Sequence, residues 1–393
     1  MKQNHIKYDN RRICYIKSGD VVNELSYVLA QSNEISGGPN YYVYSTKTLL
    51  EKEFNLLYLS LGQSKKSLSG ISCQAKSIKK KQLKNKILTF FFSLPSLLQL
   101  YREICRFRPH HIICVKRPLL LVAYLAAKKI DACLTVSVHT DMHVKNLLNN
   151  FLETFVLFKT DSVICHGPYL KNQVIETIGT TTKVVEYNAS CKDIVSLKRQ
   201  QSNLLGILKN RMPITFIGRM EKTKGVYDLY EACRPLLKQD HRFVLCYAGA
   251  GSECTGIAKC AQKDNLAGQV IVFDKLEREY VAELLRYTWV AVMPTRKEFP
   301  EGRCMAAMEA LAMGVPVIVP DFGPFPFLVE DEINGLLYKP NSVEYLREKL
   351  FYVKEPIIRK KLSLGASKRA HTFSETDLSY GEAVKKCINE CRK

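Results

Sequence analysis

The chain has 393 residues, of which 46% are hydrophobic, and this length exceeds what one hydrophobic core usually serves, so we expect two domains. Its 58 Lys and Arg against 38 Asp and Glu give a net charge of +20. The N-terminus lacks the apolar segment of a secretory signal, and the longest apolar runs are too short to span a bilayer. None of the 14 cysteines forms a Cys-x-x-Cys pair, so cysteines in apolar runs, such as Cys133, are expected to pack as small hydrophobic side chains in a reducing cytoplasm.

In the first half of the chain, short β-type runs alternate with helical stretches. The predicted helices include 42–54 and 171–178. Because such alternation is typical of parallel sheets covered by helices on both faces, it predicts a doubly wound α/β domain. The strands are predicted at 12–17, 55–60, 111–116, 133–139, 162–166 and 183–188.

Positive charge gathers in this first half, where residues 1–200 hold 29 Lys and Arg against 14 Asp and Glu. Six lysines crowd into 76–86, directly before the apolar and aromatic run 87–100. This arrangement suits an anionic membrane surface, and a solvated loop ahead of a core helix is the alternative. The chain has no zinc-finger, RNP-like or helix-turn-helix pattern, so we expect no nucleic-acid partner. We therefore expect contact with an anionic membrane through the segment 76–108.

A polar stretch without clear periodicity, about 193–211, is the predicted linker, and the strand–helix alternation begins again after it. The second set of strands is predicted at 214–219, 243–251, 270–274, 290–295 and 315–320. The helices between and beside them are predicted at 225–237, 254–265, 278–286 and 304–313. The domain boundaries that follow are 1–195, a linker at 196–210, a second domain at 211–373 and a C-terminal helix at 374–393 that packs back on the first domain.

The segment EFPEGRCMAAMEALAMGVPVIVP, residues 298–320, carries the most specific functional signal. It places Glu301 and Glu309 eight positions apart, just over two turns of a helix that we expect to start at Glu301, so both carboxylates point the same way. The backbone N–H groups of residues 302–305 would lie between them. Free amides suit a diphosphate and carboxylates suit sugar hydroxyls, so the segment indicates a sugar-nucleotide site. A surface helix with two scattered acids is the alternative.

Three neighbouring motifs favour the sugar-nucleotide interpretation. In GRMEKTKG, Gly218 ends a strand, and Arg219 and Lys224 beside a helix N-terminus form a candidate diphosphate clamp. In YAGAG, residues 247–251, glycines after a strand permit close backbone approach. In VFDKL, which ends at Leu276, the end of a strand could cradle a base.

Taken in order, these motifs resemble glycosyltransferase family 4, retaining enzymes of the GT-B fold, over most of residues 211–320. In the first half, ISGGPNYYV with Gly37 and Gly38 is similar to the family's glycine loop. His139 ends a strand, as does the histidine that this family often carries facing the donor sugar. The resemblance implies an α/β protein with two Rossmann-like, doubly wound parallel-sheet domains that face a central cleft.

The resemblance further implies retaining transfer of a sugar from a UDP- or GDP-linked donor. Arg219 and Lys224 would neutralise the diphosphate, Glu309 would accept from ribose hydroxyls, and Glu301 would hold the transferred sugar. His139 would contact the sugar or the acceptor. The implied catalytic residues are Glu301 and His139, and the implied donor-binding residues are Gly37, Gly38, Gly218, Arg219, Lys224, Leu276, Gly302, Arg303, Cys304, Met305 and Glu309.

The sequence departs from the family's pattern at two places. Arg303 and Cys304 stand where the family usually has an aromatic residue and a glycine, and VFDKL lacks the glycine commonly found after that strand. The chain also has no Asp-x-Asp triad, so Arg, Lys and the helix dipole would have to neutralise the diphosphate. We therefore expect no cofactor and no metal.

The expected acceptor is a saccharide, most plausibly lipid-linked, in bacterial surface polysaccharide biosynthesis (O-antigen, capsule or lipopolysaccharide). The expected location is the cytoplasm, peripheral on the inner face of the cytoplasmic membrane. Two alternatives remain open. One is a non-catalytic GT-B subunit that binds a nucleotide sugar or a membrane, and the other is a sugar-nucleotide epimerase.

Overall fold

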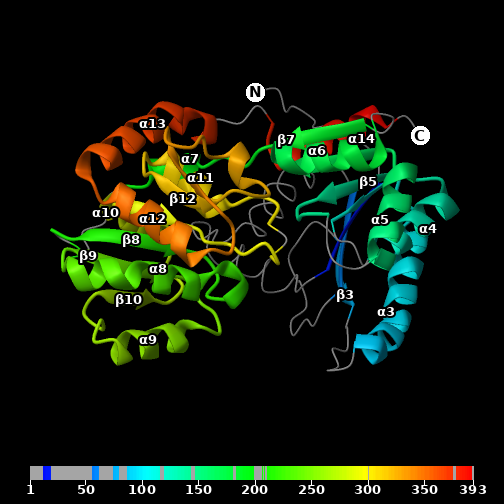
Figure 1. Cartoon of the computed structure of the whole chain (residues 1–393). Helices are drawn as coiled ribbons and strands as arrows, with labels where there is room; N and C mark the ends of the chain where they lie inside the picture. The colour runs from blue at the N-terminus through cyan, green and yellow to red at the C-terminus, as the bar shows by residue number, and fades with distance from the viewer. Residues whose placement is uncertain are drawn as a thin grey trace, which may run out of the picture. The chain divides into compact units, whose positions relative to one another are not determined.

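The computed structural model describes residues 12–18, 55–61, 74–78, 86–115, 119–142, 147–179, 183–198, 206, 208, 210–299, 301–374 and 378–391. By its internal packing the chain divides into two units (Figure 1). The first combines Met1–Asn188 with Leu378–Lys393, and the second is Ala189–Asp377. The C-terminal segment from Leu378 therefore belongs to the first unit.

The first unit is built on a seven-stranded sheet in the order β3-β2-β1-β4-β5-β6-β7, in which all neighbouring strands are parallel. The six strands predicted from the sequence are all present. One more, β3, was not predicted, because its sequence QAKSI lacks an apolar run. The strands are β1 (Arg12–Ser18), β2 (Asn55–Leu61), β3 (Gln74–Ile78), β4 (His111–Cys114), β5 (Cys133–Val138), β6 (Ser162–His166) and β7 (Lys183–Tyr187).

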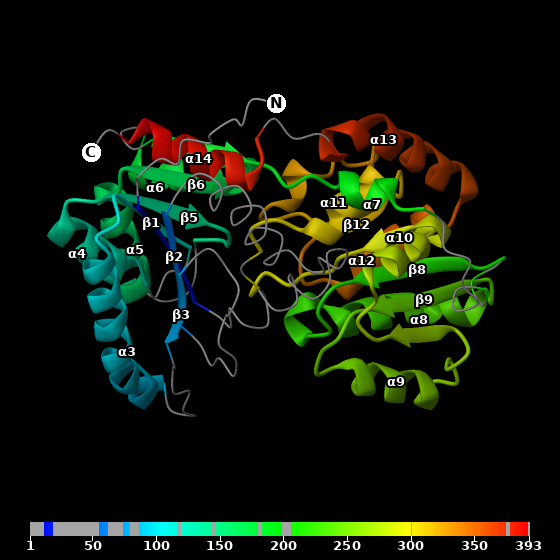
Figure 2. The ribbon, with the colours of Figure 1, turned by 180° about the vertical axis from the view of Figure 1, so that it is seen from behind.

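Helices cover this sheet, and α3, α4 and α5 lie side by side (Figures 1 and 2). Their buried side chains, such as Ile104 and Ala123, pack with Val136 of β5 in one core. Strands β4, β5 and β6 are buried along their whole length, as expected for parallel strands covered on both faces. None of the helices in the described ranges combines the length and apolarity needed to cross a membrane. The described helices of this unit are α3 (Lys86–Phe107), α4 (Leu120–Ile130), α5 (Leu147–Lys159), α6 (Gly167–Ile178) and α14 (Tyr380–Glu390).

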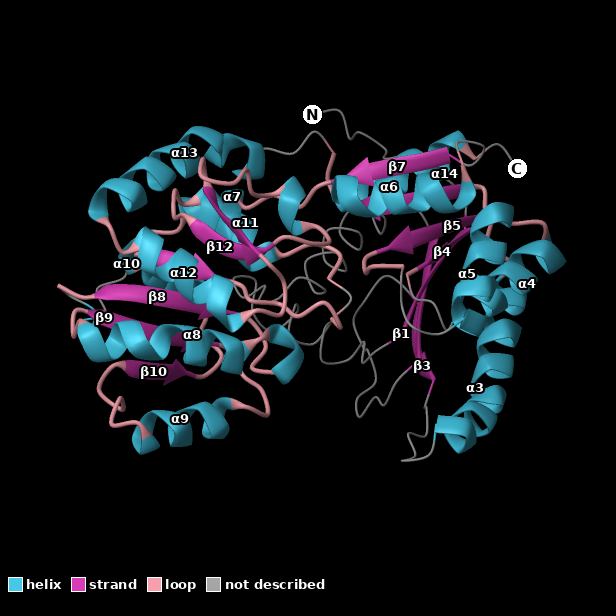
Figure 3. Cartoon of the chain, viewed as in Figure 1, coloured by secondary structure: helices cyan, strands magenta, loops and turns pink. Residues whose placement is uncertain are grey.

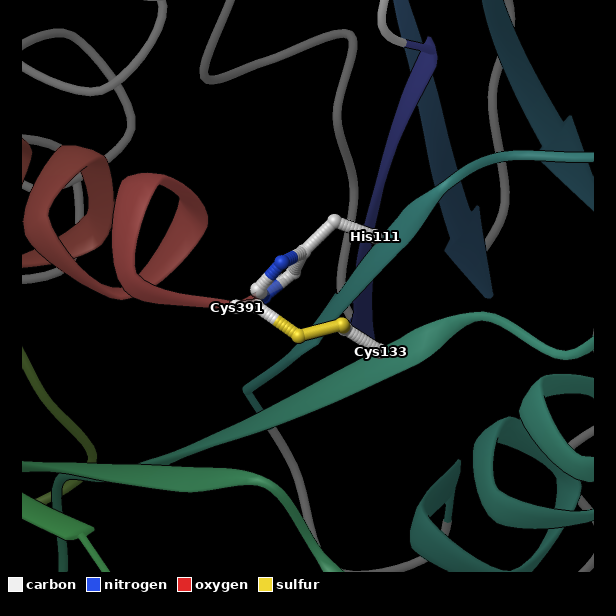
Figure 4. A group of neighbouring side chains, drawn as sticks. All are labelled: His111, Cys133 and Cys391. Atoms are coloured by element: carbon white, nitrogen blue, oxygen red, sulfur yellow. A yellow bond between two sulfur atoms is a disulfide. The ribbon is translucent and has the colours of Figure 1, made fainter. Parts of the chain in front are cut away.

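Helix α14 is fastened to the first sheet at both of its ends. Near its start, the backbone N–H of Asn188 donates to the carbonyl of Leu378 at 3.2 Å. After its end, Cys391 forms a disulfide with Cys133, the first residue of β5, beside His111 of β4 (Figure 4). The prediction that Cys133 packs only as a small hydrophobic side chain was therefore wrong, because its sulfur is bonded to a residue 258 positions away.

The second unit has a six-stranded parallel sheet in the order β10-β9-β8-β11-β12-β13 (Figure 3). The five strands predicted for this half are present, β8 shifted by two residues and the other four shorter than predicted, and β13 is an additional edge strand. The strands are β8 (Met212–Ile217), β9 (Phe243–Ala248), β10 (Val270–Phe273), β11 (Val290–Val292), β12 (Val317–Pro320) and β13 (Gly335–Tyr338).

The helices of the second unit include the four that the sequence predicted, together with three others. Helix α7 extends into the stretch predicted as a linker, and its Ile194 is buried against the core that contains α10 and α11. The helices are α7 (Lys192–Ser196), α8 (Val226–Gln239), α9 (Cys254–Lys263), α10 (Arg278–Tyr287), α11 (Met305–Ala312), α12 (Val343–Val353) and α13 (Pro356–Ser374), with short 3-10 turns η3 (Lys222–Lys224) and η4 (Phe325–Phe327).

Candidate functional site

In the second unit, the loops after β8 and β9 pack backbone against backbone at the carboxyl ends of these strands. Gly249 lies so close to the Gly218 carbonyl that a Cβ built on it would come within 1.9 Å of that oxygen. Gly225 has a left-handed φ of +72°, and its Cβ would come within 1.9 Å of the Pro294 carbonyl oxygen. Only glycine satisfies both conditions, so these positions fix where Lys224, the residue before Gly225, is held.

Lys224 forms the central ion pair of this site. Its Nζ lies 2.5 Å from Oε2 of Glu301, and the two side chains are only 14% and 11% exposed. The same ammonium lies 3.8 Å from the centre of the Phe299 ring, a cation–π contact. Since exposed ion pairs contribute little and buried ones are costly to assemble, a pair this enclosed indicates a site that needs these charges.

A second ion pair joins Glu309 to Arg278, the first residue of α10. Nη1 of Arg278 lies 3.0 Å from Oε1 of Glu309, with side chains 23% and 11% exposed. Burial raises the pKa of Glu309 above its usual value, and the Arg278 guanidinium opposes that rise. The structure thus provides each of the two predicted carboxylates with its own cation.

Helix α11 begins one residue after the predicted bound of 304, but four residues after Glu301, which was also expected to stand at the helix start. Its first residue is Met305 and its N-cap is Cys304, so Glu301 lies in the preceding loop and Glu309 only about one turn inside the helix. The prediction that the helix starts at Glu301 was wrong, because Gly302 and the two residues after it continue as a loop. Cys304 is buried, and burial raises the pKa of its thiol to about 12. This cysteine therefore packs as a neutral side chain under the helix start.

Arg219, the other half of the predicted clamp, is the exposed member of the cluster. Its side chain is 60% exposed, and Nη1 lies 2.5 Å from Oε1 of Glu221. Its guanidinium carbon lies 5.5 Å from the centre of the Phe299 ring. Phe299 therefore contacts both Arg219 and Lys224, and it places the two predicted cations around one aromatic ring.

The remaining donor-side residues of the second unit have simpler surroundings. Arg303 is half-buried, and its Nε lies 3.1 Å from Sδ of Met308, so the side chain folds along α11. Leu276 is half-buried and packs against the small core cluster of Ala248 and Phe273, at the carboxyl ends of β9 and β10. These positions place Leu276 on the same sheet edge as Gly218.

In the first unit, His139 directly follows β5, and both of its ring nitrogens have partners. Nε2 lies 2.8 Å from Oγ of Ser137, and Nδ1 lies 3.0 Å from the Tyr187 hydroxyl. The Tyr380 ring of α14 packs edge-on against the imidazole, with centroids 5.4 Å apart. This imidazole is therefore held in one orientation at the carboxyl edge of the first sheet.

Two predicted residues of the first unit, Gly37 and Gly38, lie outside the described residues.

Sequence reasoning missed the side chains that contact the predicted site residues. Phe299 and Arg278 each carried a signal, since Phe299 stands two positions before Glu301 and Arg278 follows VFDKL at a helix start. No signal pointed to Tyr187, because its partner is 48 positions away.

Among the described residues, His111, Cys133 and Cys391 are the group whose side-chain atoms lie close enough together to share a metal ion (Figure 4). His111 Nε2 lies 2.6 Å from Oγ1 of Thr135, and the two sulfurs are joined in a disulfide. Disulfide sulfurs are not thiolate ligands, so the group does not hold a metal in this form. It lies at the amino ends of β4 and β5, the edge opposite to His139.

Comparison with protein families identifies the second unit. Residues 198–368 match the family model described as glycosyl transferases group 1. An uncharacterized glycosyltransferase of Methanocaldococcus jannaschii is 28% identical over 234 residues, which cover 58% of this chain and 61% of the relative. The matches to the first curated relatives span between 39% and 61% of those proteins' lengths.

Two solved structures share the fold over nearly the whole chain. The HepE protein of Anabaena in complex with UDP and glucose gives a TM-score of 0.73 at 14% identity, covering 97% of this chain and all of the other. The lipopolysaccharide outer core galactosyltransferase WaaB, in its apo form, gives 0.63 at 16% identity, covering 96% and 99%. At such identities the likeness shows the fold, which is GT-B, as predicted.

The matched region begins in the segment before β8 and ends within α13, so it contains both ion pairs described above. The loop that carries Glu301, the helix that carries Glu309 and the glycine loops after β8 and β9 all fall inside it. Residues 198–368, which contain both carboxylates and both of their cations, are thus the part of this chain that is similar to the glycosyl transferases group 1 family.

Proposed function

We propose that the protein transfers a sugar from a nucleotide diphosphate sugar to a saccharide acceptor, with retention of the anomeric configuration. One observation carries the proposal: Lys224–Glu301 and Arg278–Glu309 put two enclosed carboxylates and two cations beside the start of α11. Cations and helix N–H groups suit a diphosphate, and carboxylates suit sugar hydroxyls. The match of residues 198–368 to the glycosyl transferases group 1 model supports the same activity. The UDP bound to the HepE protein favours UDP-sugars as the first donors to try.

Donor binding, in this proposal, exchanges the partners of the central ion pair. The diphosphate takes the place of Glu301 on Lys224, and Glu301 then accepts hydrogen bonds from the transferred sugar. Arg219 is exposed and leaves Glu221 to join Lys224 on the diphosphate. Glu309 accepts from the ribose hydroxyls. The other proposed donor contacts are Gly37, Gly38, Gly218, Leu276, Gly302, Arg303, Cys304 and Met305.

The proposed reaction needs no separate pair of acid and base carboxylates. The bond between the anomeric carbon and the diphosphate oxygen breaks while the acceptor oxygen attacks from the same face. The leaving diphosphate accepts the acceptor's hydroxyl proton. Arg219, Lys224 and the N-terminus of α11 stabilise the negative charge that develops on the leaving group. His139 contacts the sugar or the acceptor.

The acceptor proposed here is a lipid-linked saccharide of bacterial surface polysaccharide, bound by the first unit. The excess positive charge of residues 1–200 and the segment 76–108, which contains α3, support a position on the anionic inner face of the cytoplasmic membrane. The lysines at 79–81 and Lys84 lie outside the described residues. The fold likeness to the lipopolysaccharide galactosyltransferase WaaB agrees with this acceptor class.

A thermal-shift screen of UDP-, GDP- and ADP-sugars tests the donor site. A donor at 100 times its dissociation constant raises the unfolding free energy by about 3 kcal/mol. We expect one nucleotide sugar to do so, and Arg219→Ala with Lys224→Ala to abolish the shift. Lys222→Ala is the matched control, because Lys222 is an exposed lysine on the same η3 turn. No shift with any sugar in a folded sample would overturn the proposal.

Product analysis separates an enzyme from the two alternatives. We expect Glu301→Ala to bind the donor and to lose transfer or hydrolysis, whereas a non-catalytic subunit shows stabilisation and no turnover in the parent protein. An epimerase would release a nucleotide sugar of the same mass whose sugar has a different configuration, and chromatography separates the two. Free nucleoside diphosphate as the product supports the transferase.

A further inference from the structure

The outer surface of α3, α4 and α5 in the first unit is unusually apolar for a surface. On α5 the side chains of Phe151, Phe155 and Phe158 are 69%, 39% and 51% exposed. They are spaced four and three residues apart, so they form one stripe along the helix. Single apolar side chains scattered over a surface are common, but three phenylalanines in one stripe are not. Because burial of such side chains is favourable, the stripe indicates an interaction surface.

The neighbouring helices continue this surface. Leu121 and Leu125 of α4 are 37% and 48% exposed, and Leu94 and Leu98 of α3 are 40% and 56% exposed. The Tyr124 ring packs edge-on against Phe155, with centroids 5.7 Å apart, so α4 and α5 share one continuous face. Figures 1 and 2 show the three helices side by side, and α4 contacts both of the others. We call the exposed side chains of these three helices the outer helical face.

The exposed positive charges on this face gather at one end of each helix. Within each helix the exposed apolar residues come first and the exposed cations come near its C-terminal end. The exposed cations are Arg102, Arg106, Lys128, Lys129 and Lys159. Of the acids on the described parts of the same helices, Glu153 is buried and the Glu103 side chain is 15% exposed, 3.8 Å from Arg106. Asp131, the C-cap of α4, is the exposed acid at the border of the face.

The strands of this sheet are all parallel, so the helices that connect β3 to β6 run in the same direction as one another. The N-terminal ends of these helices therefore lie toward the carboxyl edge of the sheet, where His139 follows β5, and their exposed cations lie toward the opposite edge. The outer helical face is thus apolar along much of its length and basic at the end away from the predicted acceptor side.

We infer that the outer helical face docks this protein on a bilayer that contains anionic phospholipids. The phenylalanines and leucines enter the boundary between headgroups and acyl chains, and the basic ends of the helices meet lipid phosphates. Charge complementarity selects this occupant, because on the described parts of these helices the exposed charged side chains are positive and the two glutamates are largely buried. The inference deepens the proposed function and rests on it for its purpose, since docking here brings a lipid-linked acceptor to the edge that carries His139.

Vesicle co-sedimentation of the full chain tests the docking surface. We expect binding to vesicles of phosphatidylglycerol and phosphatidylcholine, weakened by salt, and little binding to phosphatidylcholine alone. The variant Phe151→Ser, Phe155→Ser and Phe158→Ser should lower the partition coefficient by at least about tenfold. Circular dichroism and the melting temperature check that the variant keeps its fold, and Phe151→Ser with Phe158→Ser, which leaves the Tyr124–Phe155 contact in place, is the milder variant.

A matched control comes from the second unit, where Ile357 and Leu364 of α13 are 81% and 55% exposed. The variant Ile357→Ser with Leu364→Ser removes comparable exposed apolar side chains, and we expect it to bind vesicles like the parent protein. Equal losses in both variants, no loss in the phenylalanine variant, or no binding to anionic vesicles would each overturn the inference. A parent dimer that the phenylalanine substitutions convert to a monomer, seen by ultracentrifugation, would instead assign the face to a second copy of the chain.

The donor screen, done without vesicles, separates failure of this inference from failure of the proposed function. Vesicle binding through the outer helical face with no donor binding leaves the docking surface intact and overturns the transferase proposal. Donor binding without vesicle binding does the reverse.

Discussion

The carboxyl edges of the two sheets differ in the kind of chemistry they carry. The edge of the second unit holds two enclosed ion pairs, Lys224–Glu301 and Arg278–Glu309. The edge of the first unit holds an imidazole, His139, fixed between two hydroxyl groups. An ion pair can exchange one partner for a charged ligand, whereas a hydrogen-bonded imidazole offers a fixed, short-range contact to a neutral one. The difference agrees with the proposed function, in which the second unit binds the anionic diphosphate and the first contacts a sugar or saccharide.

Substitution of Glu301 gives the largest effect that this comparison predicts. Glu301→Gln keeps the shape of the side chain and removes its charge, so Lys224 is free for the diphosphate while the sugar loses its anchoring carboxylate. We expect kcat to fall about a thousandfold, and the donor Kd to stay the same or tighten. Glu298→Gln is the control, because Glu298 lies in the same loop with a side chain 48% exposed. Equal kcat in the two variants would contradict the assignment.

Substitution of Arg278 tests the second ion pair through its pH dependence. Burial already raises the pKa of Glu309, and Arg278 opposes the rise, so Arg278→Gln raises that pKa further. The folded variant then keeps a proton on Glu309 to higher pH. We expect donor affinity at neutral pH to fall about tenfold and to recover as pH rises, because the carboxylate that accepts the ribose hydroxyls forms only then. Isothermal titration calorimetry between about pH 6 and pH 9 measures the donor affinity of the variant and of the parent protein.

The stability of the Arg278→Gln variant independently checks that the pKa of Glu309 is raised. An acid whose pKa is raised in the folded state loses unfolding free energy as pH rises from its usual value, 4.5, toward the raised value. The Arg278→Gln protein should therefore lose more stability than the parent over that rise. A pH-independent loss of donor affinity would show that Arg278 acts directly on the donor and not through Glu309.

In the first unit, Tyr187→Phe should act on stability and leave donor binding unchanged. The substitution removes the hydroxyl that lies 3.0 Å from His139 Nδ1, and one such hydrogen bond contributes about 1 kcal/mol. Urea unfolding measures the loss, and the thermal shift with donor should match that of the parent. Tyr230→Phe, which removes a hydroxyl bonded to Asp264 at 2.7 Å in the second unit, is the matched control. A weaker donor affinity in Tyr187→Phe would break the division of roles.

The smallest predicted effect concerns an ion pair away from the site, Asp240 with Arg242. Hydrogen bonding by Arg242 lowers the pKa of Asp240 to about 2 from 3.8, so this pair stabilises the fold above pH 3.8 and the contribution is lost as pH falls toward 2. Because the Arg242 side chain is 64% exposed, solvent screens the pair. Asp240→Asn should therefore cost less than about 1 kcal/mol near neutral pH. A larger loss of unfolding free energy, measured by urea unfolding at several pH values, would show that this exposed ion pair contributes as much stability as an enclosed one.

The sequence predicted most of the two sheets because buried parallel strands are continuous apolar runs, as in HIIC of β4 and VIVP of β12. It failed at β3, where the edge strand QAKSI is polar, and in placing Glu301 at the start of α11. In the site, glycines and charged residues near strand ends marked Lys224 and Glu301. The partners Arg278 and Tyr187 were missed, because they lie 31 and 48 positions from the residues they contact. Such pairings depend on tertiary structure, which local patterns do not encode.

The assignment of Leu378–Lys393 to the first unit also affects how the protein is made. The second unit is one continuous stretch, Ala189–Asp377, so it can fold as soon as it has left the ribosome. The first unit cannot: its β7 must wait for α14, which is synthesised after the whole second unit. The first unit, although it starts the chain, is therefore the last to be completed. Nascent chains arrested before residue 378 should hold a folded second unit and a first unit that still lacks α14 along β7.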